Sequence, residues 1–174
     1  MPTKSSFPSW LSNCLGNSEA EIRRLLTDES ALYFLIAWSL FESKCFQGFV
    51  KAEDIEDFAE RASPTIDLTA LQESAWHFYE RYQNPTLRKR LMHNKNNPRL
   101  LELLAKPFSD IRNEEIIYLL VFVIYRYRNN IFHGNKGVQS WLNYQEQIKH
   151  CTRVMQVMIS HAETKKPTMG YGIQ

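Results

Sequence analysis

Residues 116–134 read IIYLLVFVIYRYRNNIFHG, and this stretch decides the fold. Its first part, Ile116–Ile124, is the most apolar run in the chain, and a run of this length predicts a buried helix. The part that follows carries Arg128, Asn129 and His133, where a solvated Lys or Glu would be ordinary. Such side chains can bind a phosphate and transfer a proton. We therefore expect the remaining chain to be a helical frame that presents this helix end.

The chain has 174 residues, of which 44% are hydrophobic and 13% aromatic. This length and composition fit one globular domain with a core of its own. Six glycines and seven prolines are few for a turn-rich β architecture, so we expect an all-α helical bundle. The 21 Lys and Arg against 19 Asp and Glu give a formal net charge of +2. The overall charge therefore does not indicate a nucleic-acid-binding protein, and its distribution matters more.

The three cysteines, Cys14, Cys45 and Cys151, are far apart, and no pair has the spacing of metal ligands. A disulfide framework is therefore not expected. No secretory signal opens the chain, and the longest apolar run is well short of the ~20 residues that span a bilayer. We expect a reduced, cytoplasmic protein that does not enter a membrane.

Three regions are expected along the chain. They are an irregular lead-in over residues 1–16, a single helical domain over residues 17–162 and a flexible tail over residues 163–174. The domain opens on a capping box, Ser18-Glu19-Ala20-Glu21. The apolar periodicity predicts helices at about residues 18–27, 29–50, 52–62 and 67–83, two short ones within 86–106, the central helix, capped by Ser109 or Asp110, and a last one at 138–162.

The helix at 29–50 should bury one apolar stripe, formed by Leu35, Trp38, Phe46 and Phe49. Glu42 falls within that stripe, and a buried carboxylate needs a cationic or hydrogen-bonding partner. On the central helix, Arg128 lies on the side that should be buried. The simplest prediction is an ion pair between Glu42 and Arg128, which would orient the guanidinium and leave donors for a phosphate oxygen.

Positive charge gathers before the central helix, in Arg81, Arg88, Lys89, Arg90, Lys95 and Arg99. Such a run is either a solvated helix face or an electrostatic footprint for a phosphate backbone. In the second interpretation the residues that bind RNA are Arg88, Lys89, Arg90 and Lys95, together with Arg126 and Lys136 near the helix end.

The sequence from Arg128 to His133, RNNIFH, resembles the Arg-(four to six residues)-His signature of the HEPN superfamily, in its Arg-Asn-x-x-x-His form. Gly134 and the apolar helix before the motif add to the likeness. The resemblance implies a four-helix HEPN-like core with short accessory helices, in which the motif ends the third core helix. The helix at 138–162 would be the fourth core helix, and the helix at 29–50 one of the first two.

The resemblance also implies cleavage of RNA without a metal or another cofactor. The 2′-OH attacks the adjacent phosphorus, and the products are a 2′,3′-cyclic phosphate and a 5′-OH. Arg128 and Asn129 would stabilise charge on the equatorial oxygens, while His133 would transfer protons. Glu42, Asn130 and Tyr125 are expected to support the site. A homodimer would bring two motifs together across one cleft.

Other interpretations stay open at this point. His133 could simply cap the helix dipole, and Arg128 could be structural. A HEPN-like domain could also bind a nucleotide or RNA, or dock on an antitoxin or a regulatory partner, without cutting. Asn135 stands where members that pair with nucleotidyltransferase antitoxins often have a tyrosine, which argues against that pairing. A toxin or an antiviral defence effector would use the same chemistry.

Other catalytic patterns fit less well. The segment Gly134–Gly137 is too short for a P-loop, and no nucleophile elbow occurs. The remaining histidines fall on separate predicted helices or loops without metal-ligand spacing, so no metal is expected; they are His77, His93, His150 and His161.

Overall fold

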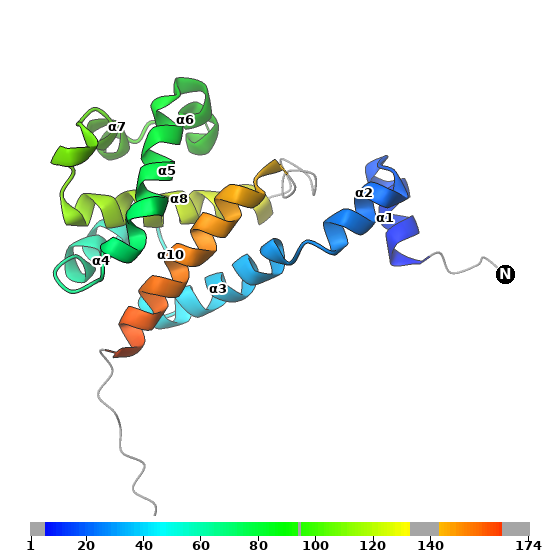
Figure 1. The fold of residues 1–174 in the computed structure, drawn as a ribbon, viewed down its shortest axis with the longest axis horizontal. Coiled ribbons are helices and arrows are strands. Elements are labelled where there is room, and N and C mark those ends of the chain that lie inside the picture. Colours follow the sequence, from blue (N-terminus) through cyan, green and yellow to red (C-terminus); the bar gives the residue numbers. More distant parts are fainter. Residues whose placement is uncertain (1–5, 94, 133–142, 165–174) are drawn as a thin grey trace, which may run out of the picture.

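The computed structural model describes residues 6–93, 95–132 and 143–164, with the side chains of Ile131 and Phe132 left out. The described part of the chain is helical and contains no strand, which confirms the all-α class. Its helices are α1 (Phe7–Leu15), α2 (Glu19–Leu26), α3 (Glu29–Cys45), α4 (Asp54–Ala62), η1 (Thr69–Leu71), α5 (Gln72–Gln83), α6 (Pro85–Met92), α7 (Pro98–Leu104), η2 (Phe108–Asp110), α8 (Asn113–Phe132) and α10 (Gln145–Thr164). Figure 1 shows their arrangement.

The bundle is built around α8, as its apolar sequence predicts. This helix packs against α4, α5, α6 and α10, while α10 also lies along α3 (Figure 1). Side chains on every side of α8 are fully buried, among them Ile117, Leu119, Leu120, Val121, Val123 and Ile124. A helix that is apolar all round needs neighbours all round. The other helices supply that enclosure.

The N-terminal arm, α1 and α2, extends beyond the start of α3 (Figure 1). The expectation of an irregular lead-in over residues 1–16 is wrong, because residues 7–15 form α1. Ser6 caps this helix by accepting a hydrogen bond from the Ser9 amide, and Gly16 ends it in the left-handed region at φ 68°. The capping box of α2 is confirmed: Ser18 Oγ accepts from the Glu21 amide, and Glu21 Oε2 accepts from the Ser18 amide.

The expected course of the helix at 29–50 needs two corrections. It ends at Cys45, because Gln47 at φ 56° and Gly48 at φ 124° adopt left-handed conformations that cannot continue a helix. Its buried stripe is Phe34, Ala37, Trp38 and Phe41. Phe49, predicted to be inside, is 77% exposed. Apolar residues lie on several faces of this segment, so the periodicity alone did not fix the buried one.

The later elements follow the predicted order with shifted boundaries. The segment 67–83 divides into η1 and α5, and the two short helices within 86–106 are α6 and α7. Ser109 and Asp110 lie in η2 instead of capping α8. The described part of the last helix begins at Gln145 and reaches Thr164, beyond the predicted start of the tail. The predicted segments 138–142 and 165–174 lie outside the described residues.

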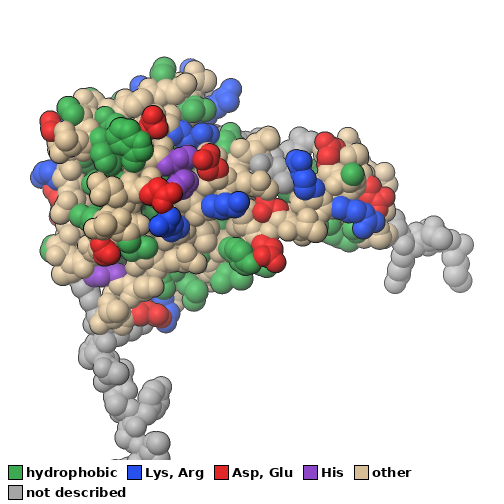
Figure 2. Space-filling model, in the orientation of Figure 1, with side chains coloured by type: hydrophobic (Ala, Val, Ile, Leu, Met, Phe, Trp, Pro, Cys, Tyr) green, Lys and Arg blue, Asp and Glu red, His purple; other side chains and the backbone are tan. Residues whose placement is uncertain are grey.

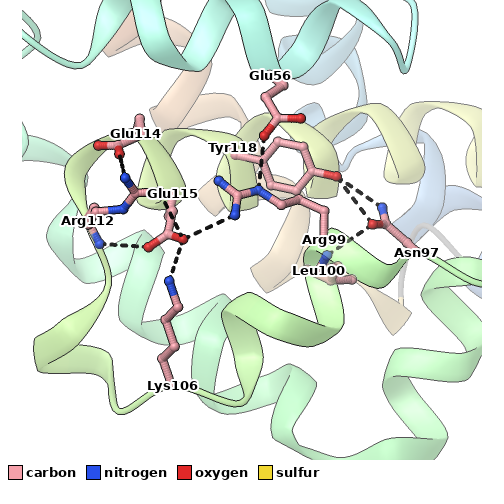
Figure 3. Close-up of polar contacts among 9 residues, drawn as sticks. All are labelled: Glu56, Asn97, Arg99, Leu100, Lys106, Arg112, Glu114, Glu115 and Tyr118. Carbon is pink, nitrogen blue, oxygen red and sulfur yellow. Dashed lines mark hydrogen bonds and ion pairs between the residues drawn. The ribbon is translucent and has the colours of Figure 1, made fainter.

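A buried carboxylate fixes the N-terminal end of α8 (Figure 3). Glu115 is 0% exposed, and its Oε1 lies 2.6 Å from Lys106 Nζ, 3.3 Å from Arg99 Nη1 and 3.5 Å from Arg112 Nη2. Its Oε2 accepts a hydrogen bond of 3.0 Å from the Arg112 amide. Arg99 also contacts Glu56 at 3.1 Å, so the network joins α4, α7 and α8. The sequence analysis did not predict this network, because its members come from three helices that meet only in the folded protein.

Burial alone would raise the pKa of Glu115, but hydrogen bonds from Lys106 and from the amide and side chain of Arg112 lower it to about 2. The ordinary value is 4.5. A folded-state pKa below the unfolded value means that the carboxylate stabilises the fold above pH 4.5. That contribution is lost as the pH falls from 4.5 towards 2.

We predict that Glu115→Gln lowers the free energy of unfolding at pH 7 by about 2–4 kcal/mol, because three cations lose a shared buried partner. Urea unfolding at pH 7 and near pH 3 measures the effect, and the difference from wild type should shrink at the lower pH. Glu114→Gln is the matched control, since the ion pair of Glu114 among the described residues is one with the exposed Arg112, at 2.9 Å. Glu114→Gln should lower the free energy of unfolding by less than about 1 kcal/mol. Equal losses in the two variants would contradict the proposed role of Glu115.

Candidate functional site

The Arg128 guanidinium lies near the C-terminal end of α8, where it contacts Trp38 and Asn129. Its Cζ is 5.7 Å from the centre of the Trp38 ring on α3, within the range of a cation–π contact. Its Nη1 donates a hydrogen bond of 3.1 Å to Asn129 Oδ1. Arg128 and Asn129 are both half-buried. The structure thus brings together two of the three predicted catalytic residues, while His133 lies outside the described residues.

The predicted ion pair between Glu42 and Arg128 is not among the contacts of the described residues, and this expectation is corrected. Glu42 Oε1 accepts a hydrogen bond of 3.4 Å from the Val50 amide, where the chain turns back after α3. Trp38, one turn earlier on α3, takes the place against Arg128. The pairing failed because the buried face of α3 is centred on Phe34, Trp38 and Phe41.

Asn130 and Arg126 attach the end of α6 to the end of α8. His93, which terminates α6 in the left-handed region at φ 51°, has its Nε2 2.5 Å from Asn130 Oδ1. Arg126 Nε donates a hydrogen bond of 2.9 Å to the Leu91 carbonyl. The sequence analysis named His93 only among the histidines without metal-ligand spacing. Its role was missed because α6 and α8 meet through tertiary packing, for which the sequence carries no local signal.

The six predicted RNA-binding residues divide into exposed and structural ones. Lys89, Arg90 and Lys95 are exposed on α6 and just after it. Arg88 is half-buried and donates a hydrogen bond of 3.0 Å to the Tyr82 carbonyl. Arg126 is half-buried as well, and burial lowers its pKa. Lys136 lies outside the described residues. The exposed cations therefore belong to the segment that His93 and Arg126 dock onto α8.

The tyrosines before the motif anchor it to the core. Tyr125 is half-buried and packs against the core cluster. Tyr127 is buried, and its hydroxyl accepts a hydrogen bond of 3.2 Å from Tyr82 on α5. Burial raises the pKa of Tyr127 to about 12, so it stays neutral at physiological pH. With these anchors, the last described turns of α8 have a defined rotation about the helix axis.

No protein-family model matches the sequence, and no curated protein or solved structure is significantly similar to it. None of the described helices has both the length and the apolar character needed to cross a bilayer. The function is therefore argued from the side chains of this chain.

We predict that Arg126→Met destabilises the fold by about 1–2 kcal/mol, because the Leu91 carbonyl loses a charged donor. Lys89→Ala removes a solvated charge and should change stability by less than about 0.5 kcal/mol. Urea unfolding measures both values. Equal stability of the two variants would mean that the Arg126–Leu91 contact does not hold α6 in place.

Proposed function

We propose that this protein is an endoribonuclease of the HEPN type, which cleaves RNA without a metal. The observation that carries the proposal is the orientation of Arg128 over Trp38 and beside Asn129, at a helix end onto which the basic helix α6 is docked. A guanidinium held by an aromatic face and an amide is preorganised for an oxyanion. The sequence spacing adds His133 to the same helix end.

The reaction needs no nucleophile from the protein. The 2′-oxygen of the ribose forms a bond to phosphorus, and the bond from phosphorus to the 5′-oxygen breaks. The proton of the 2′-OH passes to a base, and an acid supplies a proton to the leaving 5′-oxygen. His133 is the residue of suitable chemistry for these transfers.

Arg128 and Asn129 would stabilise the negative charge that develops on the equatorial oxygens of the transition state. A guanidinium carries five N–H donors, so Arg128 can contact Asn129 and a phosphate oxygen at the same time. Because Asn129 Oδ1 accepts from Arg128 Nη1, the Nδ2 group of Asn129 is directed away from that nitrogen. We propose that Arg128 and Asn129 each donate a hydrogen bond to the phosphate of the bond that is cleaved.

The RNA strand would run over α6. Lys89 and Arg90 are exposed on α6, and Lys95 is exposed just after it. When such cations bind the phosphates of RNA, they release the counterions condensed there, and this release favours binding. The contact between His93 and Asn130 joins this basic segment to the motif. Arg126 and Asn130 face α6, whereas Arg128, two residues from each, faces α3, so a strand bound along α6 would have to pass around the end of α8 to reach Arg128.

A homodimer would supply a second Arg128 and His133 to the same cleft. An exposed apolar stripe on α3 supports this arrangement: Leu32, Tyr33, Ile36 and Leu40 are between 44% and 54% exposed. Apolar patches of this kind on a soluble protein mark interaction surfaces. Ile36 and Leu40 stand two residues before and after Trp38, so the stripe lies on the face of α3 that points away from Trp38 and Arg128, and we propose that this face contacts the second copy of the chain.

The function is tested by incubating purified protein with mixed RNA in EDTA. We predict cleavage by the wild type, and a loss of at least about 100-fold in rate for Arg128→Ala and for His133→Ala, because each removes charge stabilisation or proton transfer. His161→Ala, a histidine on α10 away from the motif, is the matched control and should keep full activity. Products ending in a 2′,3′-cyclic phosphate identify the 2′-OH as nucleophile.

Two results would contradict the proposed nuclease function. Equal cleavage by all variants would indicate a contaminating enzyme. Intact RNA retained on a gel by wild type and both motif variants would leave a non-catalytic RNA-binding module, which could still dock on an antitoxin or a regulatory partner. A toxin or defence role is tested by expression of wild type and His133→Ala in growing cells.

We predict that Ile36→Glu makes the protein monomeric in light scattering at micromolar concentration and abolishes cleavage, because a charge in an apolar contact must be desolvated. Leu101→Glu is the control, since Leu101 is also an exposed apolar residue but lies on α7. A wild-type protein that is already a monomer, and still cleaves, would contradict the shared cleft.

A further inference from the structure

The fold brings two histidines and a glutamate together on the face where α5 and α10 meet. His77 lies on α5, and Glu146 and His150 are four residues apart on α10, so both project from one side of that helix. One ligand atom from each of the three side chains lies within 4.8 Å of the others. Figure 2 shows histidine side chains at this junction, with acidic and basic side chains beside them.

The two imidazole rings are stacked, with their centroids 4.1 Å apart and an interplanar angle of 20°. Burial lowers the pKa of His77, and the neighbouring His150 lowers it further. Arg81 acts in the same direction, whereas Glu146 and Glu80 oppose it. His77 is therefore neutral at physiological pH, and the neutral imidazole is the form that binds metals.

A second observation points to a ligand at this place. His77 Nε2 is buried, and no hydrogen-bond partner for it lies among the described residues. A buried polar atom without a partner costs free energy unless something binds it. In His150, by contrast, one ring nitrogen has a partner: Nδ1 lies 2.9 Å from the hydroxyl of the buried Ser74, and this contact orients the ring. A partner on one ring nitrogen that leaves the other available is typical of metal-binding histidines.

We propose that His77, Glu146 and His150 bind one Zn²⁺ ion between α5 and α10. Two imidazoles and one carboxylate are a common zinc ligand set, with a fourth position left for water. Ligand atoms around Zn²⁺ are roughly 3.3 Å apart at tetrahedral angles. The three ligand atoms now lie within 4.8 Å of one another, so binding requires Glu146, which is exposed, to move closer and one of the stacked imidazole rings to rotate until the in-plane lone pairs of both histidines point at the ion.

Space for the fourth ligand is present beside the proposed site. A cavity of about 220 Å³ is lined by Glu73, Glu146, Lys149, His150 and Arg153. The positive charge of Arg153 is balanced by Glu73, whose Oε2 lies 2.6 Å from Arg153 Nη1. The remaining cation, Lys149, is exposed and can turn towards solvent.

The ion would link α5 to α10. This site does not depend on the proposed nuclease activity, because that chemistry uses no metal. It affects the nuclease assay in one respect: EDTA would remove the link. Cleavage assays are therefore run below the unfolding temperature of the metal-free protein, with His77→Gln included as a metal-free reference.

The test uses the full chain, freed of metal by chelation and dialysis, and titrated with ZnCl₂ by calorimetry and with CoCl₂ by visible spectroscopy. We expect one ion per chain, absorption bands of tetrahedral cobalt and a higher melting temperature with zinc. His77→Gln and His150→Gln should weaken binding by at least about 100-fold, and Ser74→Ala by about 10–100-fold, because it orients His150. His161→Gln, on the same helix, should bind as the wild type does.

Circular dichroism and melting of the metal-free variants establish that each one is folded. If His77→Gln does not fold, Glu146→Gln replaces it, since Glu146 is exposed and its change leaves the core intact. The absence of saturable zinc binding to the wild type would overturn the proposal. So would unchanged affinity in folded His77→Gln or Glu146→Gln, because the ion would then be bound elsewhere.

Discussion

The enclosure of α8 is the constraint on which the rest of the structure depends. Its side chains from Ile117 to Ile124 are buried on all sides, and α4, α5, α6 and α10 are placed to cover it. Polar groups are excluded from the middle of such a helix and can be accommodated only near its ends. Polar clusters around Glu115 and around Arg128 lie at those ends.

The charged groups at the two ends of α8 are stabilised by different kinds of partner. Glu115 is fully buried, and three cations with an amide hold its pKa at about 2. Arg128 contacts the face of the Trp38 ring and donates to the amide oxygen of Asn129. A buried carboxylate whose charge is matched by neighbouring cations stabilises the fold. A cation held by an aromatic ring and an amide keeps its full charge, which suits the binding of an anion.

Local sequence rules performed well where the interactions are local. The capping box at Ser18 and the predicted order of the helices both depend on residues within about one or two turns of each other. The rules failed for α3, where apolar residues on several faces allow more than one buried stripe. Because Glu42 was assigned to the buried stripe, the sequence analysis predicted an ion pair between Glu42 and Arg128. In the structure the Trp38 ring lies against Arg128.

The sequence by itself determined that the chain is helical, that α8 is its buried centre, and that Arg128 and Asn129 stand near the end of that helix, because periodicity and spacing along one helix are set by its 3.6-residue turn. Only the tertiary structure decided which distant side chains meet. His93 with Asn130, Glu115 with Lys106 and Arg99, and His77 with His150 come from different helices. Their contacts depend on how each helix is rotated and where it crosses its neighbour. Those quantities follow from the packing of the whole core.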